Sequence, residues 1–194
     1  MGPDREAPET PSLGDNRAMP QLLVGPIEAL APSLRQQIMS YPPPGSDLPS
    51  AQPDAHVAQV VLVEGDEVLS YAEITSGIAE HDAARLVVRG LSDVWTYPAF
   101  RGRGHGSRVV EAATSFIRAS EADLGMLFCH PDLHRFYAAA GWRATPEMVV
   151  HFDPPDRPSL YSGESVMCLF VSEQGIVAAP AMSSGSVYLG RRLW

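Results

Sequence analysis

The chain of 194 residues contains no lysine, because all 14 of its basic residues are arginines. A Walker A loop needs a lysine after its last glycine to reach the outer phosphates of a nucleotide. Schiff-base catalysis and the protein-kinase mechanism each depend on a catalytic lysine as well. The sequence therefore excludes P-loop nucleotide hydrolysis, Schiff-base chemistry and lysine-dependent kinase chemistry together.

Long apolar runs and cysteines are also scarce. No apolar run approaches the roughly 20 residues that span a bilayer, and residues 1–20 are polar and proline-rich, unlike a signal peptide. We expect these residues to form a disordered leader. The two cysteines, Cys129 and Cys168, lie in apolar segments with the pattern of strands, which predicts buried reduced thiols. A cytoplasmic protein without membrane association is expected.

The chain has fewer basic residues than acidic ones, 14 against 23. The net charge of −9 and the pI near 5.0 argue against a nucleic-acid partner, whose binding depends on neutralising phosphates. An acidic surface favours a soluble protein and, at most, cationic substrates. The length and the 45% hydrophobic content suit one domain, over 21–194. The sequence leaves the oligomeric state open, with a homodimer as one candidate.

The most informative feature that is present is the glycine-rich segment Arg101–Gly106, which reads Arg-Gly-Arg-Gly-His-Gly. It lies between an apolar stretch, 94–97, and a segment with helical spacing that starts near Ser107. The first N–H groups of a helix have no internal partner, and the helix dipole favours an anion there. The segment therefore predicts a phosphate-binding loop at a helix N-terminus.

Glycine-rich loops also occur in other kinds of binding site. A dinucleotide-binding fold needs Gly-x-Gly-x-x-Gly and an acidic residue about twenty positions later. Here the spacing is Gly102-x-Gly104-x-Gly106, and Glu121 falls where the helix ends, which disfavours that fold. A flexible surface loop or an RNA-binding tract stays possible for the six residues alone. The amphipathic helix that follows favours a structured loop.

A second motif follows about thirty residues later. The segment 136–142 reads Phe-Tyr-Ala-Ala-Ala-Gly-Trp and ends a helical pattern. Pro131 suits the first position of that helix, and Gly141 suits the position after its end. Both ends of the helix are therefore marked in the sequence.

These two motifs together resemble the signatures of the GNAT superfamily of N-acetyltransferases. In that family an Arg/Gln-x-x-Gly-x-Gly/Ala loop, matched by Arg101, Gly104 and Gly106, binds the pyrophosphate of acyl-CoA. The resemblance implies an α/β fold with a mixed, mostly antiparallel sheet, a V-shaped splay between its two central strands, and helices on both faces. The expected strands are 21–24, 56–64, 67–78, 83–97, 125–129 and 166–171, and the expected helices are 27–40 in two pieces, 104–119 and 131–140.

The resemblance also implies acetyl-CoA as cosubstrate and a primary amine of a small molecule as acceptor. The strand before the glycine loop aligns the thioester in this family, and the loop holds the phosphates. The residues expected to bind acetyl-CoA are Val94, Trp95, Thr96, Arg101, Gly102, Arg103, Gly104, His105, Gly106 and Ser107. His105 is expected to supply a backbone N–H group rather than imidazole catalysis.

Catalytic roles follow from the same resemblance. Tyr137 is the expected general acid for the leaving thiolate, although helical periodicity alone would make it a core tyrosine. Asp93 is the leading carboxylate for the proton of the amine, with an exposed strand residue as an equal alternative. Glu73, on the preceding strand, is the reserve candidate. His130 and His134 are four residues apart, but helix capping and solvation explain them better than a metal pair, and we expect no metal.

Within the superfamily the chain is most similar to the aminoglycoside 2′-N-acetyltransferases. The similarity includes both motifs, the proline-rich stretch after 142, the apolar segment 167–170 and a C-terminal tryptophan. It implies that the terminal carboxylate of Trp194 helps to receive the substrate's amines. Ser92 stands where that family carries a catalytic glutamate, and with Glu73 it is a further expected substrate-binding residue.

The C-terminus differs from that subfamily in charge. An acidic residue precedes the final tryptophan by two positions in the family, whereas this chain has Arg192 there, beside Arg191. Two cations near a pocket for a polycation would repel it. Two alternatives to aminoglycosides therefore stay open: acetylation of a less charged small-molecule or peptide amine, and a regulatory module that binds acyl-CoA without catalysis.

Overall fold

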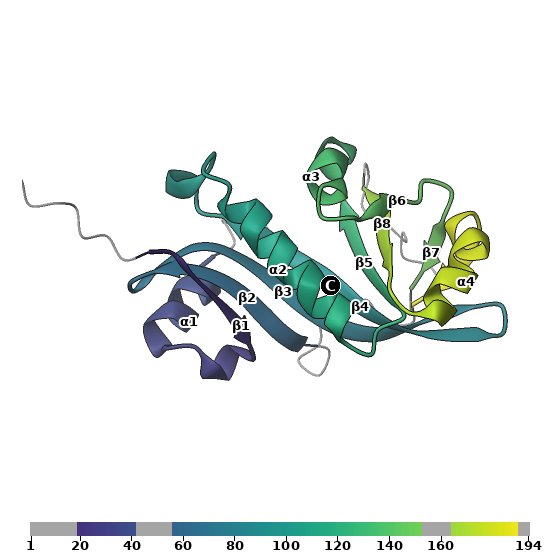
Figure 1. Cartoon of the computed structure of the whole chain (residues 1–194), viewed down its shortest axis with the longest axis horizontal. Helices are drawn as coiled ribbons and strands as arrows, with labels where there is room; N and C mark the ends of the chain where they lie inside the picture. The colour runs from purple at the N-terminus through teal and green to yellow at the C-terminus, as the bar shows by residue number, and fades with distance from the viewer. Residues whose placement is uncertain (1–18, 42–55, 153–163, 190–194) are drawn as a thin grey trace, which may run out of the picture.

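A computed structural model describes residues 19–41, 56–152 and 164–189 (Figure 1). Nearly all of the predicted leader, 1–20, lies outside these ranges, as do Arg191, Arg192 and Trp194. Over the described ranges, the strands are β1 (Gln21–Gly25), β2 (His56–Glu64), β3 (Glu67–His81), β4 (Ala84–Thr96), β5 (Leu124–Cys129), β6 (Arg143–Ala144), β7 (Val149–His151), β8 (Ser165–Phe170) and β9 (Ser186–Tyr188). The helices are α1 (Pro32–Met39), α2 (His105–Ala119), α3 (His134–Ala138) and α4 (Glu173–Ser183), with short 3-10 turns η1 (Ile27–Ala29), η3 (Pro98–Phe100) and η4 (Pro131–Leu133).

The described strands form one mixed sheet, in the order β1-β2-β3-β4-β5-β8-β6, and β9 adds to β3 and β7. Its pairs are antiparallel except β4 with β5 and β7 with β9. The predicted hairpin between β2 and β3 is confirmed. Its turn places Gly65 at φ +59°, a left-handed conformation that glycine adopts without a Cβ penalty.

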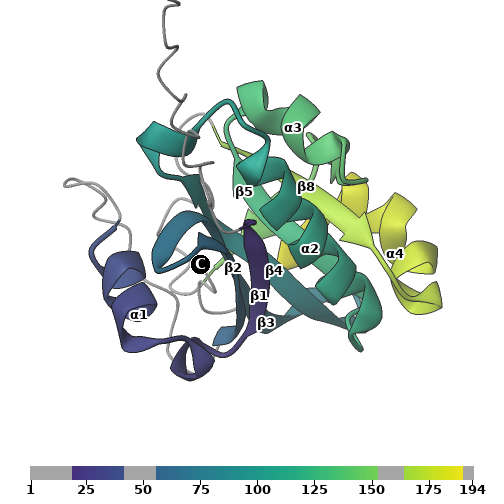
Figure 2. The same cartoon turned by 60° about the vertical axis from the view of Figure 1, so that its left-hand side comes forward.

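Helices cover both faces of the sheet, as Figure 2 shows with α1 and α2 on opposite sides of the strands. Side chains of a strand alternate between faces, so Val60 and Leu62 of β2 pack with α2, whereas Val61 and Val63 pack with α1. Burying both faces in this way fixes the register of β2 and its neighbours, because a slip by one residue would exchange the two sets.

The two central strands splay apart, as predicted. β4 and β5 pair in parallel only from Val88↔Leu124 to Gly90↔Met126. Within the described residues, the edge of β4 beyond Gly90 that faces β5 has no strand partner, although β4 continues to Thr96. The fold therefore leaves unpaired backbone groups on β4 beside the glycine loop.

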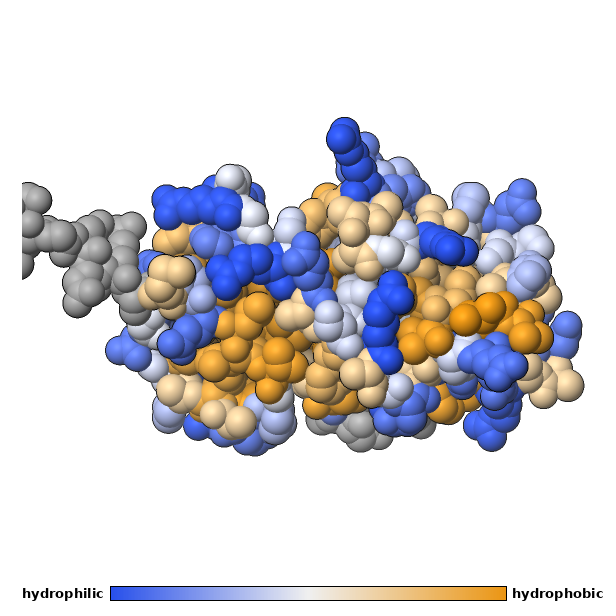
Figure 3. Space-filling view, in the orientation of Figure 1, coloured by the Kyte–Doolittle hydropathy of each residue, from blue (hydrophilic) through white to orange (hydrophobic). Residues whose placement is uncertain are grey.

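Several elements differ from the sequence prediction. The helix α4 was not predicted, because Pro180 lies inside it and its apolar residues are not confined to one side. Ile176 and Val177 of this helix are exposed and contribute to the apolar surface over α4 in Figure 3. The C-terminal stretch was expected to hold strands alone. Across the ranges that the structure describes, no helix combines the length and apolarity needed to cross a bilayer.

Candidate active site

The glycine loop and the splayed end of β4 enclose one cavity of about 400 Å³, here called the loop cavity. Its walls come from β4, the loop, the start of α2 and the η4–α3 segment. It is lined by Val94, Trp95, Thr96, Phe100, Arg101, Gly102, Gly104, His105, Gly106, Ser107, Leu133, Phe136 and Tyr137. Every residue expected to bind acetyl-CoA therefore lines this cavity except Arg103, and Tyr137 of the second motif lines it too.

The loop has the backbone geometry of an anion site at a helix N-terminus. Gly102 and Gly104 adopt φ +76° and +77°, a region that residues with a Cβ rarely enter. Gly104, which has no side chain, is the N-cap of α2, and within the described residues no side-chain hydrogen bond caps this end of the helix. The first N–H groups of a 15-residue helix thus point toward the loop cavity without side-chain partners.

Gly106 lets α2 approach β4 closely. A Cβ at this position would lie 3.2 Å from Thr96 Oγ1 and 3.5 Å from Phe136 Cζ. Thr96 is itself held by Ser70, whose Oγ lies 2.9 Å from Thr96 Oγ1 and donates to the Trp95 carbonyl at 2.8 Å. The helix N-terminus and the unpaired end of β4 are therefore fixed relative to each other.

The arginines around the loop are partly engaged with the protein. Arg101 Nε donates to the Thr96 carbonyl at 3.1 Å, and Arg108 Nη2 donates to the Pro20 carbonyl at 3.2 Å. Arg103 lies with Cζ 5.9 Å from the centre of the Phe100 ring, outside the loop cavity. Partial burial, with Arg108 and Arg103 nearby, lowers the pKa of His105. A neutral His105 agrees with the expectation that its backbone, not its imidazole, serves the loop.

Tyr137 is buried, and its side chain faces the loop cavity from α3. Within the described residues, no hydrogen bond is made by its hydroxyl group, while its ring packs edge-on against Phe136 with centroids 4.9 Å apart. Burial, and to a smaller degree the neighbouring Cys129, raises the pKa of Tyr137 well above its ordinary value. The phenol is therefore protonated at neutral pH and can donate a proton.

The second motif positions α3 through Trp142. This residue is almost fully buried, and its Nε1 donates to Thr114 Oγ1 of α2 at 2.9 Å. A Cβ on Gly125 of β5 would lie only 2.8 Å from the Trp142 ring, so the strand needs glycine there. Trp142 thus ties the end of α3 to both α2 and β5 and fixes the position of Tyr137.

β4 carries a bulge immediately before the loop cavity. The register passes from Glu73↔Ser92 to Tyr71↔Trp95, which leaves one extra residue on β4. At this point Asp93 adopts φ +48°, an uncommon conformation for a residue other than glycine. The bulge exposes Asp93 and turns it toward Glu73 of β3.

A cluster of carboxyl groups lies at this bulge. The carboxyl groups of Glu73 and Asp93 are close enough to share a hydrogen bond when one of them is protonated. His56 Nδ1 bonds Glu73 Oε1, and Gln59 Nε2 donates to the same oxygen at 3.0 Å. Desolvation is the largest effect on both carboxyl groups and raises the pKa of each, even though Asp93 is solvent-accessible. His56 acts in the opposite direction and lowers the pKa of both.

Sequence reasoning identified Asp93 and Glu73 but missed their partners. His56, Gln59 and Tyr71 lie on β2 and β3, and no motif marks them. The alternation of strand residues could have placed Gln59 opposite Glu73, since both belong to a hairpin of predicted register. The bulge could not have been found in this way.

These side chains border a second cavity, of about 350 Å³, here called the carboxyl cavity. It is lined by Pro26, Ile27, Glu28, His56, Val57, Gln59, Tyr71 and Glu73. Tyr71 packs against Trp95 with ring centroids 5.3 Å apart, and Trp95 lines the loop cavity. Asp93 directly precedes Val94, another loop-cavity residue. The two cavities are therefore separated by the bulge of β4.

Several other predicted positions do not line the loop cavity. Ser92 pairs with Glu73, and its buried Oγ has no hydrogen-bond partner in the part of the chain that the structure describes. His134 bonds Ser165, and His130 contacts Asp132 at 3.3 Å. Cys129 and Cys168 are buried free thiols, as predicted, and burial raises the pKa of Cys129 to about 11. Trp194, expected near the substrate, lies outside the described residues.

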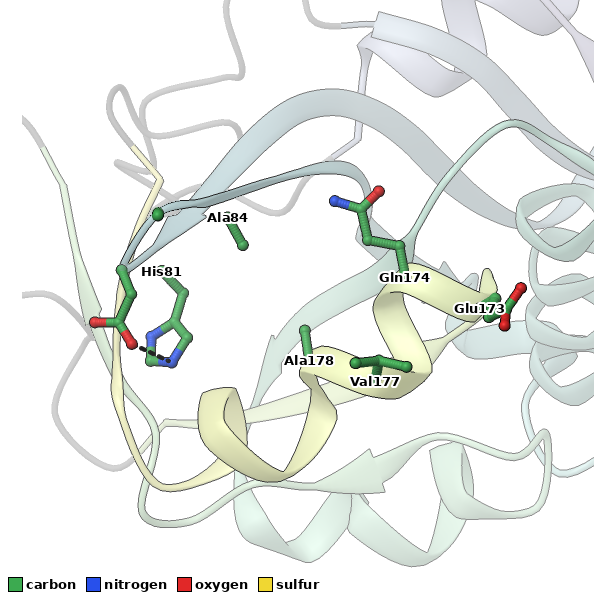
Figure 4. Close-up of a pocket in the computed structure, with 8 residues that line it drawn as sticks. His81, Ala84, Glu173, Gln174, Val177 and Ala178 are labelled. Atoms are coloured by element: carbon green, nitrogen blue, oxygen red, sulfur yellow. Dashed lines mark ion pairs between the residues drawn. The ribbon is translucent and has the colours of Figure 1, made fainter.

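A larger cavity, of about 620 Å³, lies elsewhere, between the tip of the β3–β4 hairpin and α4 (Figure 4). Its wall includes His81 and Asp82, whose Nε2 and Oδ2 atoms are 3.7 Å apart, and Val177 of α4. No residue of either motif lines it. The loop cavity, although smaller, is therefore the candidate active site.

Comparison with known proteins agrees with this geometry. The model of the acetyltransferase (GNAT) family matches residues 30–142. Among solved structures, the chain is similar to the GNAT family N-acetyltransferase YhbS from Escherichia coli in complex with CoA, at 12% identity and TM-score 0.54, over 96% of this chain and 93% of that one. It is also similar to Escherichia coli ElaA, at 17% identity and TM-score 0.53, over 77% of this chain and 99% of that one.

A putative N-acetyltransferase from Lactobacillus plantarum gives a comparable result, at 17% identity and TM-score 0.51, over 79% of this chain and 99% of that one. At such identities these structures show a shared fold alone. No curated protein matches the sequence. The family model, in contrast, spans more than half of the chain and includes the glycine loop and both ends of the second motif. The chain belongs to the GNAT family of acetyltransferases.

Proposed function

We propose that the protein transfers an acetyl group from acetyl-CoA to a primary amine of a small molecule. One observation carries this proposal: the glycine loop, the unpaired end of β4 and Tyr137 all line the loop cavity. A donor bound by its phosphates at the loop would thereby extend along β4 toward a proton donor. The CoA complex of the structurally similar YhbS agrees with this assignment.

The N-terminus of α2 would hold the pyrophosphate. The backbone N–H groups of Arg103, Gly104, His105 and Gly106 are the expected donors, since Gly104 caps the helix and its neighbours form the first turn. Nothing lies within 4 Å of a Cβ position on Gly104, so the space above it is open to a ligand. The pyrophosphate charge would also be favoured by the helix dipole.

The splayed end of β4 would align the thioester. Between Val94 and Thr96, backbone groups on the edge that faces β5 have no strand partner within the described residues. Such groups can bond the pantetheine chain and polarise the thioester carbonyl as negative charge develops on its oxygen. The protein then supplies position and hydrogen bonds, and the substrate amine is the nucleophile.

A protonated amine must lose a proton before it can attack. Asp93 is exposed beside the loop cavity and shares a hydrogen bond with Glu73, so the two carboxyl groups act as a coupled base with Asp93 nearer the acceptor. Burial raises the pKa of both carboxyl groups toward neutral pH. A general base works best when its pKa lies near the pH of the reaction, because it must both take up and release a proton in each cycle.

Collapse of the tetrahedral intermediate breaks the carbon–sulfur bond, and the thiolate takes a proton. Tyr137 is the proposed donor, because its hydroxyl group has no hydrogen-bond partner among the described residues and burial keeps it protonated. The phenolate recovers a proton from the nitrogen, which carries an excess proton after attack. The products are the acetylated amine and CoA.

The acceptor is proposed to be an amine with less positive charge than an aminoglycoside. The resemblance to aminoglycoside 2′-N-acetyltransferases supports a small-molecule amine, while Arg191 and Arg192 oppose a polycation. An amine on a peptide and a silent acyl-CoA-binding module are the alternatives. Amine-dependent thiol release from acetyl-CoA, measured over a panel of mono- and polyamines, tests the proposal. Binding without release for every amine would favour the silent module.

A further inference from the structure

We propose that His56 carries the acceptor's proton from the Asp93–Glu73 pair to solvent, as a positioning and proton-relay residue that acts through Glu73. This inference rests on the proposed function. It adds a residue of β2 to a site whose other members lie on β3, β4, the loop and α3.

A continuous chain of side-chain contacts supports the relay. Asp93 shares a hydrogen bond with Glu73 across the bulge, and Glu73 Oε1 bonds His56 Nδ1. The side chain of Glu73 is only 7% exposed, whereas that of His56 is 31% exposed. The chain therefore starts beside the loop cavity, passes through a buried carboxyl group and ends at a partly exposed imidazole.

The reaction needs such a route. Acetylation of a protonated amine yields a neutral amide and a neutral thiol, so one net proton leaves the site in every turnover. An acceptor placed for attack on the thioester would lie over Asp93 and cover it from solvent. The carboxyl cavity, on the other side of Glu73, has about 350 Å³, which is room for several water molecules.

Every proton in the proposed transfer has a donor and an acceptor. The nitrogen–hydrogen bond of the ammonium breaks, and its proton joins the Asp93 carboxylate as the amine regains its lone pair. A proton moves from the carboxyl pair to the lone pair of His56 Nδ1, which gives an imidazolium ion. That ion releases the proton on Nε2 to water, and exchange with water restores the first tautomer. No oxidant or further reactant is needed.

Imidazole is the ring suited to this step, because its ordinary pKa lies near neutral pH. Gln59 also bonds Glu73 Oε1, at 3.0 Å, but an amide does not titrate and serves only to orient the carboxyl group. Among the described residues, the titratable groups near His56 include Glu73 and Asp93, together with Glu28 of η1 and Tyr71 across the carboxyl cavity.

The test uses the full chain and one acceptor amine in weakly buffered solution. His56→Ala should lower kcat by at least about tenfold, which is less than the 10²–10⁴ typical of a direct general base. The KM for the amine should change little. Added imidazole, which can enter the carboxyl cavity, should restore a substantial part of kcat in a saturable manner. His56→Gln keeps a hydrogen-bond donor near Glu73 without a titrating ring and should stay slow.

Gln59→Met is the matched control, because it removes the other hydrogen bond to the same oxygen of Glu73. Any loss of kcat in this variant should not respond to imidazole. A His56→Ala enzyme with wild-type kcat, or one that imidazole does not rescue, would overturn the relay. A raised KM with unchanged kcat would overturn it too and would make the carboxyl cavity the acceptor pocket. Wild-type enzyme that binds acetyl-CoA but acetylates no amine would contradict the proposed function, and the relay with it.

Discussion

Glu73 on β3 and Asp93 on β4 share a hydrogen bond across the bulge that precedes the glycine loop. In a regular antiparallel register, Asp93 would point to the opposite face of the sheet from Glu73. The extra residue on β4 turns Asp93 toward Glu73. The same bulge leads into the unpaired stretch of β4. One local irregularity therefore forms both the proposed base and the proposed thioester site.

The pH dependence of activity should reflect this pair. Desolvation raises the pKa of both carboxyl groups, so kcat/KM should fall as the pH drops through a value above the ordinary carboxyl range. A protonated His56 lowers both pKa values, and a neutral Gln at this position should raise them. The acid side of the kcat/KM profile of His56→Gln should therefore move to higher pH. The exposed His151 provides a control, and His151→Gln should leave the profile unchanged.

Donor binding should depend on Gly104. In Gly104→Glu, a side chain would enter the space open to the pyrophosphate, a carboxylate would repel it, and the left-handed φ of +77° would be strained. Gly65→Glu is the matched control, because Gly65 has a similar φ of +59°, an open Cβ position and no place in the loop cavity. Calorimetry should show a large loss of acetyl-CoA affinity for the first variant only. Equal affinities would mean that the phosphates bind elsewhere.

Tyr137→Phe tests the general acid. The variant keeps the ring packing against Phe136 and loses only a hydroxyl group that has no hydrogen bond within the described residues, so the fold should be retained. Turnover at saturating substrates should fall about 10²-fold or more, while acetyl-CoA affinity stays nearly constant. Wild-type turnover in this variant would remove Tyr137 from the mechanism.

Gly125 should matter for stability rather than for catalysis. In Gly125→Ala the new Cβ would lie 2.8 Å from the Trp142 ring and 3.3 Å from Ile117 Cγ2, and overpacking of this kind costs about 1–3 kcal/mol. Gly25→Ala, whose Cβ would have nothing within 4 Å, is the control and should change the unfolding free energy by less than about 0.5 kcal/mol. Denaturant unfolding of both variants measures the difference. Equal stability would mean that Trp142 moves freely.

Local patterns made much of the fold and the loop cavity predictable. The β2–β3 hairpin, the glycine loop with α2, and Tyr137 on α3 each depend on residues close together in sequence. Gly141 was expected directly after the helix, but α3 ends at Ala138, and Gly141, at φ +96°, lies in the turn that follows. In these segments the hydrophobic period and the turn residues indicate the same structure.

The carboxyl cluster was less accessible to sequence reasoning. His56, Glu73 and Asp93 come from three strands, and their contacts depend on the sheet register and on irregularities at both ends of the cluster. A strand pattern does not show where an extra residue enters. The helix α4 was not predicted because Pro180 disfavours a helix locally. The helix is stabilised by packing against β8 and by the N-cap residue Ser172, whose side chain accepts a hydrogen bond from Gly175 N.

Aminoglycosides should be poor substrates. Arg191 and Arg192 lie within three residues of Trp194, which the resemblance to aminoglycoside 2′-N-acetyltransferases implies is near the acceptor, and two cations there would oppose a polyamine. We expect weak or absent 2′-acetylation of tobramycin and gentamicin and better activity on an amine with less charge. A kcat/KM of about 10⁴ M⁻¹s⁻¹ or above on either drug would contradict this, since that is ordinary efficiency for a true substrate.

The central claim is acetyl transfer from acetyl-CoA to an amine, and amine-dependent thiol release tests it most directly. The purified protein should release CoA from acetyl-CoA when a suitable primary amine is added, with the acetylated amine detected by mass spectrometry. Tyr137→Phe, assayed in parallel, should release CoA at least about 10²-fold more slowly. Acetyl-CoA binding without an acetylated product from any amine in the panel would contradict the account.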